Sequence, residues 1–88
     1  MKKIIVYGSP LCPGCVEAKE YLTEKGVEFI YQDITGDLGA MKRFLKIRDT
    51  NPQYDEVRAK GAIGIPTVLV DDELYIGPEK EDLEKLIG

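Results

Sequence analysis

The chain has 88 residues, enough for one hydrophobic core but not for two, so we expect a single domain over residues 1–88. It contains no histidine, which excludes Cys–His and Ser–His nucleophile pairs and removes the commonest metal ligand. The net charge is −4 and the twelve basic residues are scattered along the chain, which argues against a nucleic acid partner.

The first half of the chain is predicted to form a strand, a helix and a second strand. Residues 3–7 are almost continuously apolar and β-branched, typical of a strand covered on both faces, and Gly8-Ser9-Pro10 ends it. Residues 13–25 place apolar side chains on one helical face, with a proline at the first position and a glycine after the last. Residues 27–32 predict the second strand, which completes a βαβ unit.

The second half is predicted to hold two helices, a β-hairpin and a final helix. The first helix begins at Leu38 and stops near residues 49–51, and a short helix follows from Asn51-Pro52 to Gly61. The hairpin strands are expected at 67–70 and 74–76, and the last helix is expected to begin at Gly77-Pro78, with its apolar stripe at Leu83, Leu86 and Ile87. No stretch approaches the roughly 18 apolar residues of a membrane span, so we expect a cytoplasmic protein with no membrane partner.

The only two cysteines, Cys12 and Cys15, stand in a Cys-Pro-Gly-Cys motif at the start of the first predicted helix. The first helical turn brings residues three apart onto one side, so the two sulfurs can meet. A reducing compartment argues against a structural role for a lone disulfide. Cys-x-x-Cys beside a βαβ unit predicts a thioredoxin-like redox site.

The two thiols are expected to have unequal roles in catalysis. Cys12 is the predicted N-cap, where unpaired backbone N–H groups and the helix dipole favour a thiolate, so we assign it as the nucleophile. Cys15 lies on the apolar face of the first turn and is assigned as the resolving thiol. In this cycle Cys12 forms a mixed disulfide with a disulfide substrate, and Cys15 then displaces that substrate.

Other interpretations of the cysteine pair stay open. A zinc site needs four ligands, and one copy of this chain has no histidine and no second cysteine pair, so we expect no bound metal. A metal or iron–sulfur cluster bridged between two copies through Cys12 is the alternative function. Two idle buried thiols would be a purely structural interpretation.

The motifs Val6-Tyr7, Pro10, Cys12-Pro13-x-Cys15, Ile65-Pro66 and Ile76-Gly77 occur in an order and spacing that resembles the glutaredoxins, members of the thioredoxin superfamily. The resemblance spans nearly the whole chain. It implies an α/β thioredoxin fold, with a four-stranded mixed β-sheet flanked by helices on both faces. It also implies that the Ile65–Pro66 bond is cis, whereas an X–Pro bond taken alone favours trans.

The same resemblance implies that substrate is bound by Tyr7, Pro13, Ile65, Pro66 and Gly77, with the backbone at Ile65 pairing with the substrate like an added strand. For Tyr7, a place in the core is the competing interpretation. The implied activity is an oxidoreductase that reduces protein or low-molecular-weight disulfides, acts as a monomer and holds no bound cofactor. Glutathione would then be a co-substrate.

Three positions depart from the family pattern where glutathione would be contacted. Ser9 replaces a Lys or Arg three residues before Cys12, and Gly14 replaces an aromatic residue inside the motif. Pro78 replaces a glycine and cannot donate a backbone N–H. A flavin disulfide reductase therefore remains the other candidate electron donor.

Overall fold

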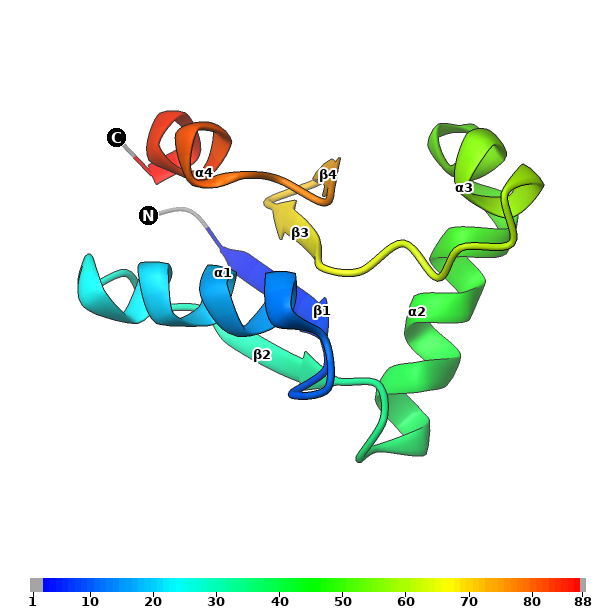
Figure 1. Ribbon diagram of the computed structural model, residues 1–88, viewed down its shortest axis with the longest axis horizontal. Helices are drawn as coiled ribbons and strands as arrows, with labels where there is room; N and C mark the ends of the chain where they lie inside the picture. Colours follow the sequence, from blue (N-terminus) through cyan, green and yellow to red (C-terminus); the bar gives the residue numbers. More distant parts are fainter. Residues whose placement is uncertain (1–2, 88) are drawn as a thin grey trace.

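The computed structural model describes residues 3–87 and has a mixed four-stranded sheet with helices on both faces, which confirms the predicted fold class (Figure 1). The elements in chain order are β1 (Ile4–Gly8), α1 (Pro13–Glu24), β2 (Ile30–Asp33), α2 (Leu38–Thr50), the 3₁₀ turn η1 (Pro52–Tyr54), α3 (Asp55–Ala59), β3 (Thr67–Val70), β4 (Glu73–Ile76) and α4 (Lys80–Ile87). Within residues 3–87, no helix combines the length and the apolar character needed to cross a membrane.

The strands lie in the order β2-β1-β3-β4. β1 pairs in parallel with β2, and α1 makes the crossover connection that parallel neighbours require. β1 and β3 are antiparallel, as are β3 and β4, which form the predicted hairpin. Asp71 sits in the hairpin turn at a φ of 56°, a left-handed conformation that Asp tolerates better than most residues. Because β1 and β3 run in opposite directions, β3 begins at the edge of the sheet where β1 ends, and this is also the edge from which the chain enters α1.

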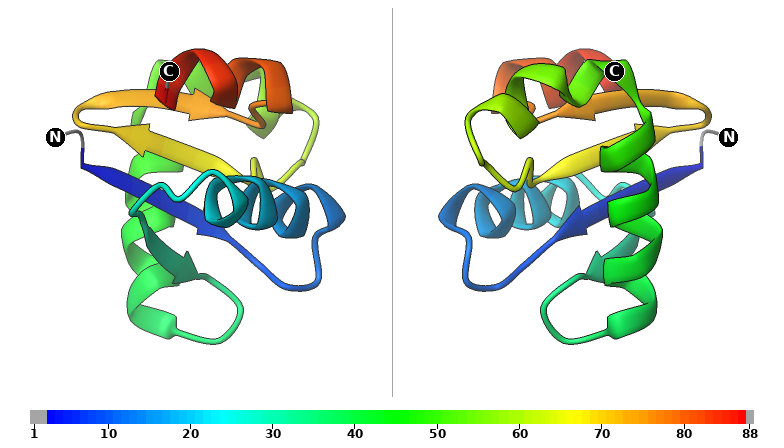
Figure 2. Two further views of the ribbon diagram at one scale, coloured as in Figure 1. Left: turned by 90° about the vertical axis from the view of Figure 1, so that its left-hand side faces the viewer. Right: turned by 90° about the vertical axis from the view of Figure 1, so that its right-hand side faces the viewer.

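Two hydrophobic cores lie on opposite faces of the sheet, because successive strand residues point to opposite sides. Figure 2 shows the helices that cover these two faces. On one face Val6 and Val68 pack against Leu22 of α1 and Leu83 of α4. On the other face Tyr7 and Leu74 pack against Ala40, Phe44 and Tyr54. The helices α1 and α4 thus cover one face, and α2 with the segment that follows it covers the other.

Three elements differ from the sequence prediction by more than one residue or in type. β2 begins at Ile30 rather than at residue 27, because the Val27 N–H still bonds to the Leu22 carbonyl (3.1 Å) and closes the end of α1. The short helix after Asn51 is split into η1 and α3. The last helix begins at Lys80 rather than at Pro78, and the Asp82 carboxylate accepts a hydrogen bond from the Glu79 N–H (3.0 Å).

Candidate active site

Cys12 is the N-cap residue of α1, as the sequence predicts. Its backbone is extended (φ −105°, ψ 115°), and its carbonyl accepts from the N–H groups of Cys15 (3.0 Å) and Val16 (3.1 Å). Pro13 occupies the first turn, where a backbone N–H has no partner within the helix, so the proline costs no helical hydrogen bond. The Cys12 side chain therefore lies at the end of the helix where unpaired N–H groups and the positive end of the dipole are found.

The two thiols, both free, have very different surroundings. Cys12 is half-buried, whereas Cys15 has no exposed surface. Burial, followed by the hydrogen bond of Cys15 with the Cys12 side chain, raises the pKa of Cys15 from 9.0 to about 12, although a hydrogen bond from the Ser9 backbone opposes this shift. Cys15 is therefore a protonated thiol at neutral pH, and Cys12 is the more accessible sulfur.

The segment before β3 lies directly against Cys12. The Ile65–Pro66 bond is cis, which confirms the prediction. The Cys12 sulfur lies 4.0 Å from the Ile65 carbonyl oxygen, and the Gly77 N–H donates to the Pro66 carbonyl (2.7 Å). The structure thus brings together four predicted site residues, Cys12, Ile65, Pro66 and Gly77, from three separate parts of the chain.

The loop that leads into Pro66 is held by side chains of α2, η1 and β3. The Arg48 guanidinium donates from Nε to the Ile63 carbonyl (2.9 Å) and from Nη2 to the Ala62 carbonyl (2.6 Å). Thr67 donates from its hydroxyl to the Gly64 carbonyl (2.7 Å), and the Tyr54 hydroxyl lies 2.6 Å from that of Thr67. These contacts hold the loop in the position that places the Ile65 carbonyl beside the Cys12 sulfur.

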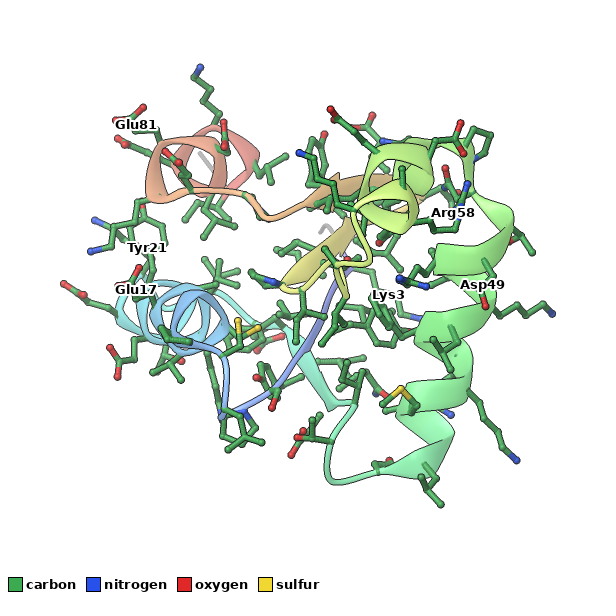
Figure 3. The ribbon with its side chains drawn as sticks, turned by 45° about the vertical axis from the view of Figure 1, so that its right-hand side comes forward. Lys3, Glu17, Tyr21, Asp49, Arg58 and Glu81 are labelled. Carbon is green, nitrogen blue, oxygen red and sulfur yellow. The ribbon has the colours of Figure 1, made fainter. Side chains whose placement is uncertain are left out.

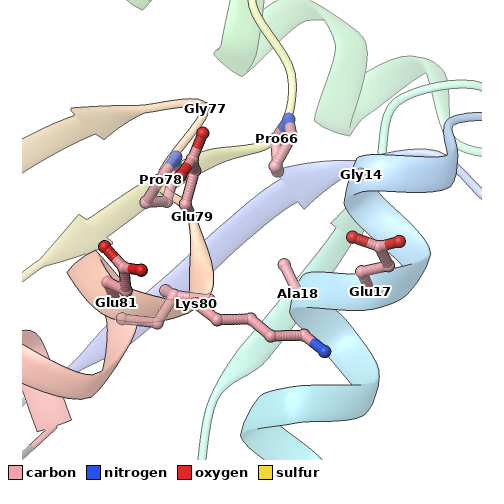
Figure 4. Close-up of a pocket in the computed structure, with 10 residues that line it drawn as sticks. Gly14, Glu17, Ala18, Pro66, Gly77, Pro78, Glu79, Lys80 and Glu81 are labelled. Carbon is pink, nitrogen blue, oxygen red and sulfur yellow. The ribbon is translucent and has the colours of Figure 1, made fainter.

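A groove of about 400 Å³ opens on the α1 and α4 side of Pro66 (Figure 4). It is bounded by Gly14 of α1 and by Gly77, and charged side chains from both helices line it. Three of these side chains are acidic, Glu17, Glu79 and Glu81, and one is basic, Lys80. Glu17 of α1 and Glu81 of α4 lie on the same side of the molecule (Figure 3). We call this the acidic groove.

A second groove of about 480 Å³ lies on the α2 side of Cys12, and we call it the Leu11–Ile63 groove. Most of its lining is apolar, and Cys12 itself forms part of the wall. The residues that line it are Ser9, Leu11, Cys12, Ile34, Thr35, Met41, Phe44, Leu45, Arg48, Gly61, Ala62, Ile63 and Ile65. Cys12 therefore stands between an apolar groove and the Pro66 segment that borders the acidic groove.

Tyr7, predicted to contact substrate, lies away from both grooves. It is 5% exposed, packs with its ring centroid 5.9 Å from that of Phe44 and lines neither groove, which favours the core interpretation. Arg58 is not open to a ligand carboxylate either, because it is hydrogen-bonded to Asp55 and to the carbonyls of Arg48 and Asn51. Its guanidinium holds the end of α2 against α3 instead.

Tyr31 is a neighbour of the cysteines that the sequence does not reveal. A Cβ atom on Gly8 would lie 3.0 Å from the Cys15 sulfur and 3.0 Å from the Tyr31 hydroxyl, so the two groups crowd the same glycine. Burial and then the negative charge of Cys15 raise the pKa of Tyr31 to about 12. Only the parallel register of β2 on β1 places Tyr31 here, and that register is not visible in a single sequence.

No cluster of three or more His, Cys, Asp or Glu side chains suited to a metal ion occurs among residues 3–87.

Comparisons with known proteins agree with this geometry. The family model for glutaredoxin matches residues 4–75, which include both cysteines and the cis-proline. The chain belongs to the glutaredoxin family. A glutaredoxin-like 8.6 kDa protein encoded in the rubredoxin operon of Clostridium pasteurianum is 30% identical over 84 residues, 96% of each chain. A probable glutaredoxin of Synechocystis is 34% identical over 71 residues, 81% of this chain and 55% of that one.

Solved structures of similar proteins share the fold. The glutaredoxin of Archaeoglobus fulgidus superposes with a TM-score of 0.71 at 26% identity, over 99% of this chain and 87% of that one. The thioredoxin-like protein BC3987 superposes with a TM-score of 0.68 at 31% identity, over 96% and 99% of the two chains. Membership in the glutaredoxin family, together with this fold, indicates a thiol oxidoreductase.

Proposed function

We propose that the protein is a dithiol disulfide oxidoreductase in which Cys12 attacks the substrate and Cys15 resolves the mixed disulfide. The observation that carries this proposal is the contrast between the two sulfurs. Cys12 is half-buried at the N-terminus of α1 and borders a groove, whereas Cys15 is fully buried and hydrogen-bonded to it. Only one of them is accessible to a substrate, and the other is in reach of the first.

In the first step the Cys12 thiolate attacks one sulfur of a substrate disulfide. A bond forms between the Cys12 sulfur and that sulfur, the substrate S–S bond breaks, and the leaving thiolate takes a proton from solvent. In the second step the Cys15 thiol gives up its proton and attacks the Cys12 sulfur, and the second substrate thiolate leaves and is protonated. Two electrons pass to the substrate, and a Cys12–Cys15 disulfide remains.

The raised pKa of Cys15 supports this order of events. Burial is the largest cause of the raised pKa of Cys15, its hydrogen bond with Cys12 is the next, and the charge of Cys12 adds a smaller part. In the mixed disulfide the Cys12 sulfur carries no charge, so this smaller part of the shift is lost and the pKa of Cys15 falls, while the effect of burial remains. The Cys15 thiolate is thus easier to form in the mixed disulfide than in the free dithiol.

Substrate binding is proposed at the segment between the two grooves. The Ile65 carbonyl lies beside the Cys12 sulfur, where an extended substrate backbone could pair with it. The Gly77 N–H is hydrogen-bonded to the Pro66 carbonyl, and Pro13 begins α1. These three residues would therefore position the backbone around the substrate. No observation favours the alternative function, a metal or iron–sulfur cluster bridged by Cys12 of two copies.

The electron donor is proposed to be either glutathione as co-substrate or a flavin disulfide reductase. Oxidised protein is offered each donor separately, glutathione alone or NADPH with the reductase, and loss of the Cys12–Cys15 disulfide is followed by thiol labelling. Reduction by one donor assigns it, and failure with both would remove both donors from the proposal.

The catalytic assignment is tested by a single turnover of 2-hydroxyethyl disulfide, a neutral substrate, with pre-reduced protein and no other thiol present. The wild-type protein is expected to release two molecules of 2-mercaptoethanol per chain and Cys12→Ser none, whereas Cys15→Ser is expected to release one, because the other stays in a mixed disulfide with Cys12. Activity of Cys12→Ser at the wild-type rate would overturn the proposal.

A further inference from the structure

The Leu11–Ile63 groove exposes large apolar side chains beside the reactive sulfur. Leu11, directly before Cys12, is 82% exposed, and Ile63, two residues before Ile65, is 57% exposed. Both line the groove whose wall includes Cys12. Contiguous exposed apolar surface of this kind marks a site of interaction.

The polar side chains of this groove are already engaged. Arg48 donates to the carbonyls of Ala62 and Ile63. The hydroxyls of Ser9 and Thr35 lie 2.9 Å apart, and that of Ser9 also accepts from the Leu11 N–H (3.1 Å). The groove is therefore suited to an apolar side chain and offers a carboxylate no uncommitted cation.

The acidic groove on the other side of Pro66 disfavours an anionic ligand. Glu17, Glu79 and Glu81 face a single lysine, Lys80, in its lining. The chain as a whole is also negative, with a net charge of −4. Like charges close to a binding site reduce both the affinity and the association rate of a partner.

We propose that the substrate is a protein or peptide disulfide in which the cysteine has an apolar neighbour, and that this neighbour occupies the Leu11–Ile63 groove. This inference rests on the proposed function, since it concerns the substrate that Cys12 attacks. A mixed disulfide holds the substrate sulfur about 2.05 Å from the Cys12 sulfur, and the adjacent residue is only about 3.8 Å further along the chain. That residue therefore lies close to Cys12, and the groove of about 480 Å³ has room for its side chain.

The substrate preference is measured with pairs of neutral peptide disulfides that differ only in the residue beside the cysteine, leucine or serine, placed before or after it. The rate constant for attack is measured with pre-reduced Cys15→Ser protein, in which the mixed disulfide accumulates. The leucine peptide is expected to react about tenfold faster in at least one placement, which corresponds to about 1.4 kcal/mol. Equal rates in both placements would overturn the inference.

Variants locate the preference in the groove. Leu11→Gln combined with Ile63→Thr is expected to bring the leucine-to-serine rate ratio close to one. Leu38→Gln is the matched control, because Leu38 is 79% exposed but lies at the start of α2 and lines neither groove, so the ratio should not change. If the ratio persists in the double variant, or is lost in the control, the groove is not the binding site.

Failure of the substrate class is distinguishable from failure of the proposed function. If 2-hydroxyethyl disulfide is not reduced at all, the proposed function fails, whereas normal reduction without any peptide preference refutes only the substrate class. Sedimentation of the reduced wild-type protein tests a second copy as the occupant of the groove. A concentration-dependent dimer that Leu11→Gln dissociates would assign the groove to self-association and overturn the inference.

Discussion

A buried relay of hydroxyl groups connects η1 to the loop that carries the cis-proline. Tyr54 and Thr67 are both fully buried, and their hydroxyl oxygens lie 2.6 Å apart. The single hydrogen of the Thr67 hydroxyl goes to the Gly64 carbonyl, so the Tyr54 O–H must be the donor to Thr67. The relay runs from the Tyr54 hydroxyl through the Thr67 hydroxyl to the Gly64 carbonyl. The Thr67 hydroxyl accepts one of these hydrogen bonds and donates the other.

Replacing Thr67 by valine keeps the shape of the side chain but breaks both bonds of this relay. The Tyr54 O–H is left buried without an acceptor, and the Gly64 carbonyl loses its donor. Each buried group left without a partner costs about 1–3 kcal/mol, so the two together should lower the free energy of unfolding by about 2–6 kcal/mol. Tyr54→Phe removes one bond and leaves Thr67 donating to Gly64, so it should cost about 1 kcal/mol.

The double variant gives the sharpest result, because Tyr54→Phe removes the hydroxyl that Thr67→Val leaves unsatisfied. The combined loss should be about 1 kcal/mol smaller than the sum of the single losses. The free energy of unfolding is measured in urea under reducing conditions, and thermal midpoints should fall by roughly 4–8 °C per kcal/mol. Strictly additive losses, or a smaller loss for Thr67→Val than for Tyr54→Phe, would refute this account of the relay.

Three further predictions follow from the site. Gly8→Ala would place a Cβ 3.0 Å from the sulfur and the Cβ of buried Cys15, so unfolding experiments should show a loss of about 1–3 kcal/mol, and no loss would contradict the close packing. Because folding raises the pKa of Cys15 from 9.0 to about 12, its thiol contributes stability below pH 9 that is lost as the pH rises toward 12. The free energy of unfolding of the reduced wild type should therefore fall relative to that of Cys15→Ala over this range, and parallel pH profiles would contradict the shift. Arg48→Met removes the donors to Ala62 and Ile63, so amide hydrogen exchange at residues 61–65 should speed up, while Arg43→Met, whose guanidinium bonds to Gln32 instead, should leave that exchange unchanged.

The sequence predicts the elements of this fold well where local signals are strong. The β-branched run ending at Gly8, the proline after Cys12 and the glycine after Lys25 set the bounds of β1 and α1 within one residue. The hairpin also follows from local patterns, whereas the mixed four-stranded sheet is implied by the family resemblance. The start of β2 does not, because it depends on where the end of α1 releases the chain and not on the apolar content of residues 27–29.

Contacts between residues far apart in the chain cannot be predicted from this sequence. Spacing alone predicts that Cys12 caps α1, and the family resemblance adds that Pro66 is cis. Neither indicates that Tyr31 crowds Cys15, because that depends on sheet register. Nor does either indicate that Leu38 and Leu45 of α2 are exposed, because that depends on the rotation of α2 against the sheet. The Leu11–Ile63 groove is invisible for the same reason, since its two sides are more than fifty residues apart in the chain.

The central claim, that Cys12 attacks and Cys15 resolves, is tested most directly by trapping the mixed disulfide. Reduced Cys15→Ser and Cys12→Ser proteins are each treated with a disulfide substrate, and the adducts are located by mass spectrometry of peptides after acid quenching. We predict an adduct on Cys12 in Cys15→Ser, none on Cys15 in Cys12→Ser, and an internal Cys12–Cys15 disulfide in the wild type. Rapid adduct formation on Cys15 would contradict the assignment.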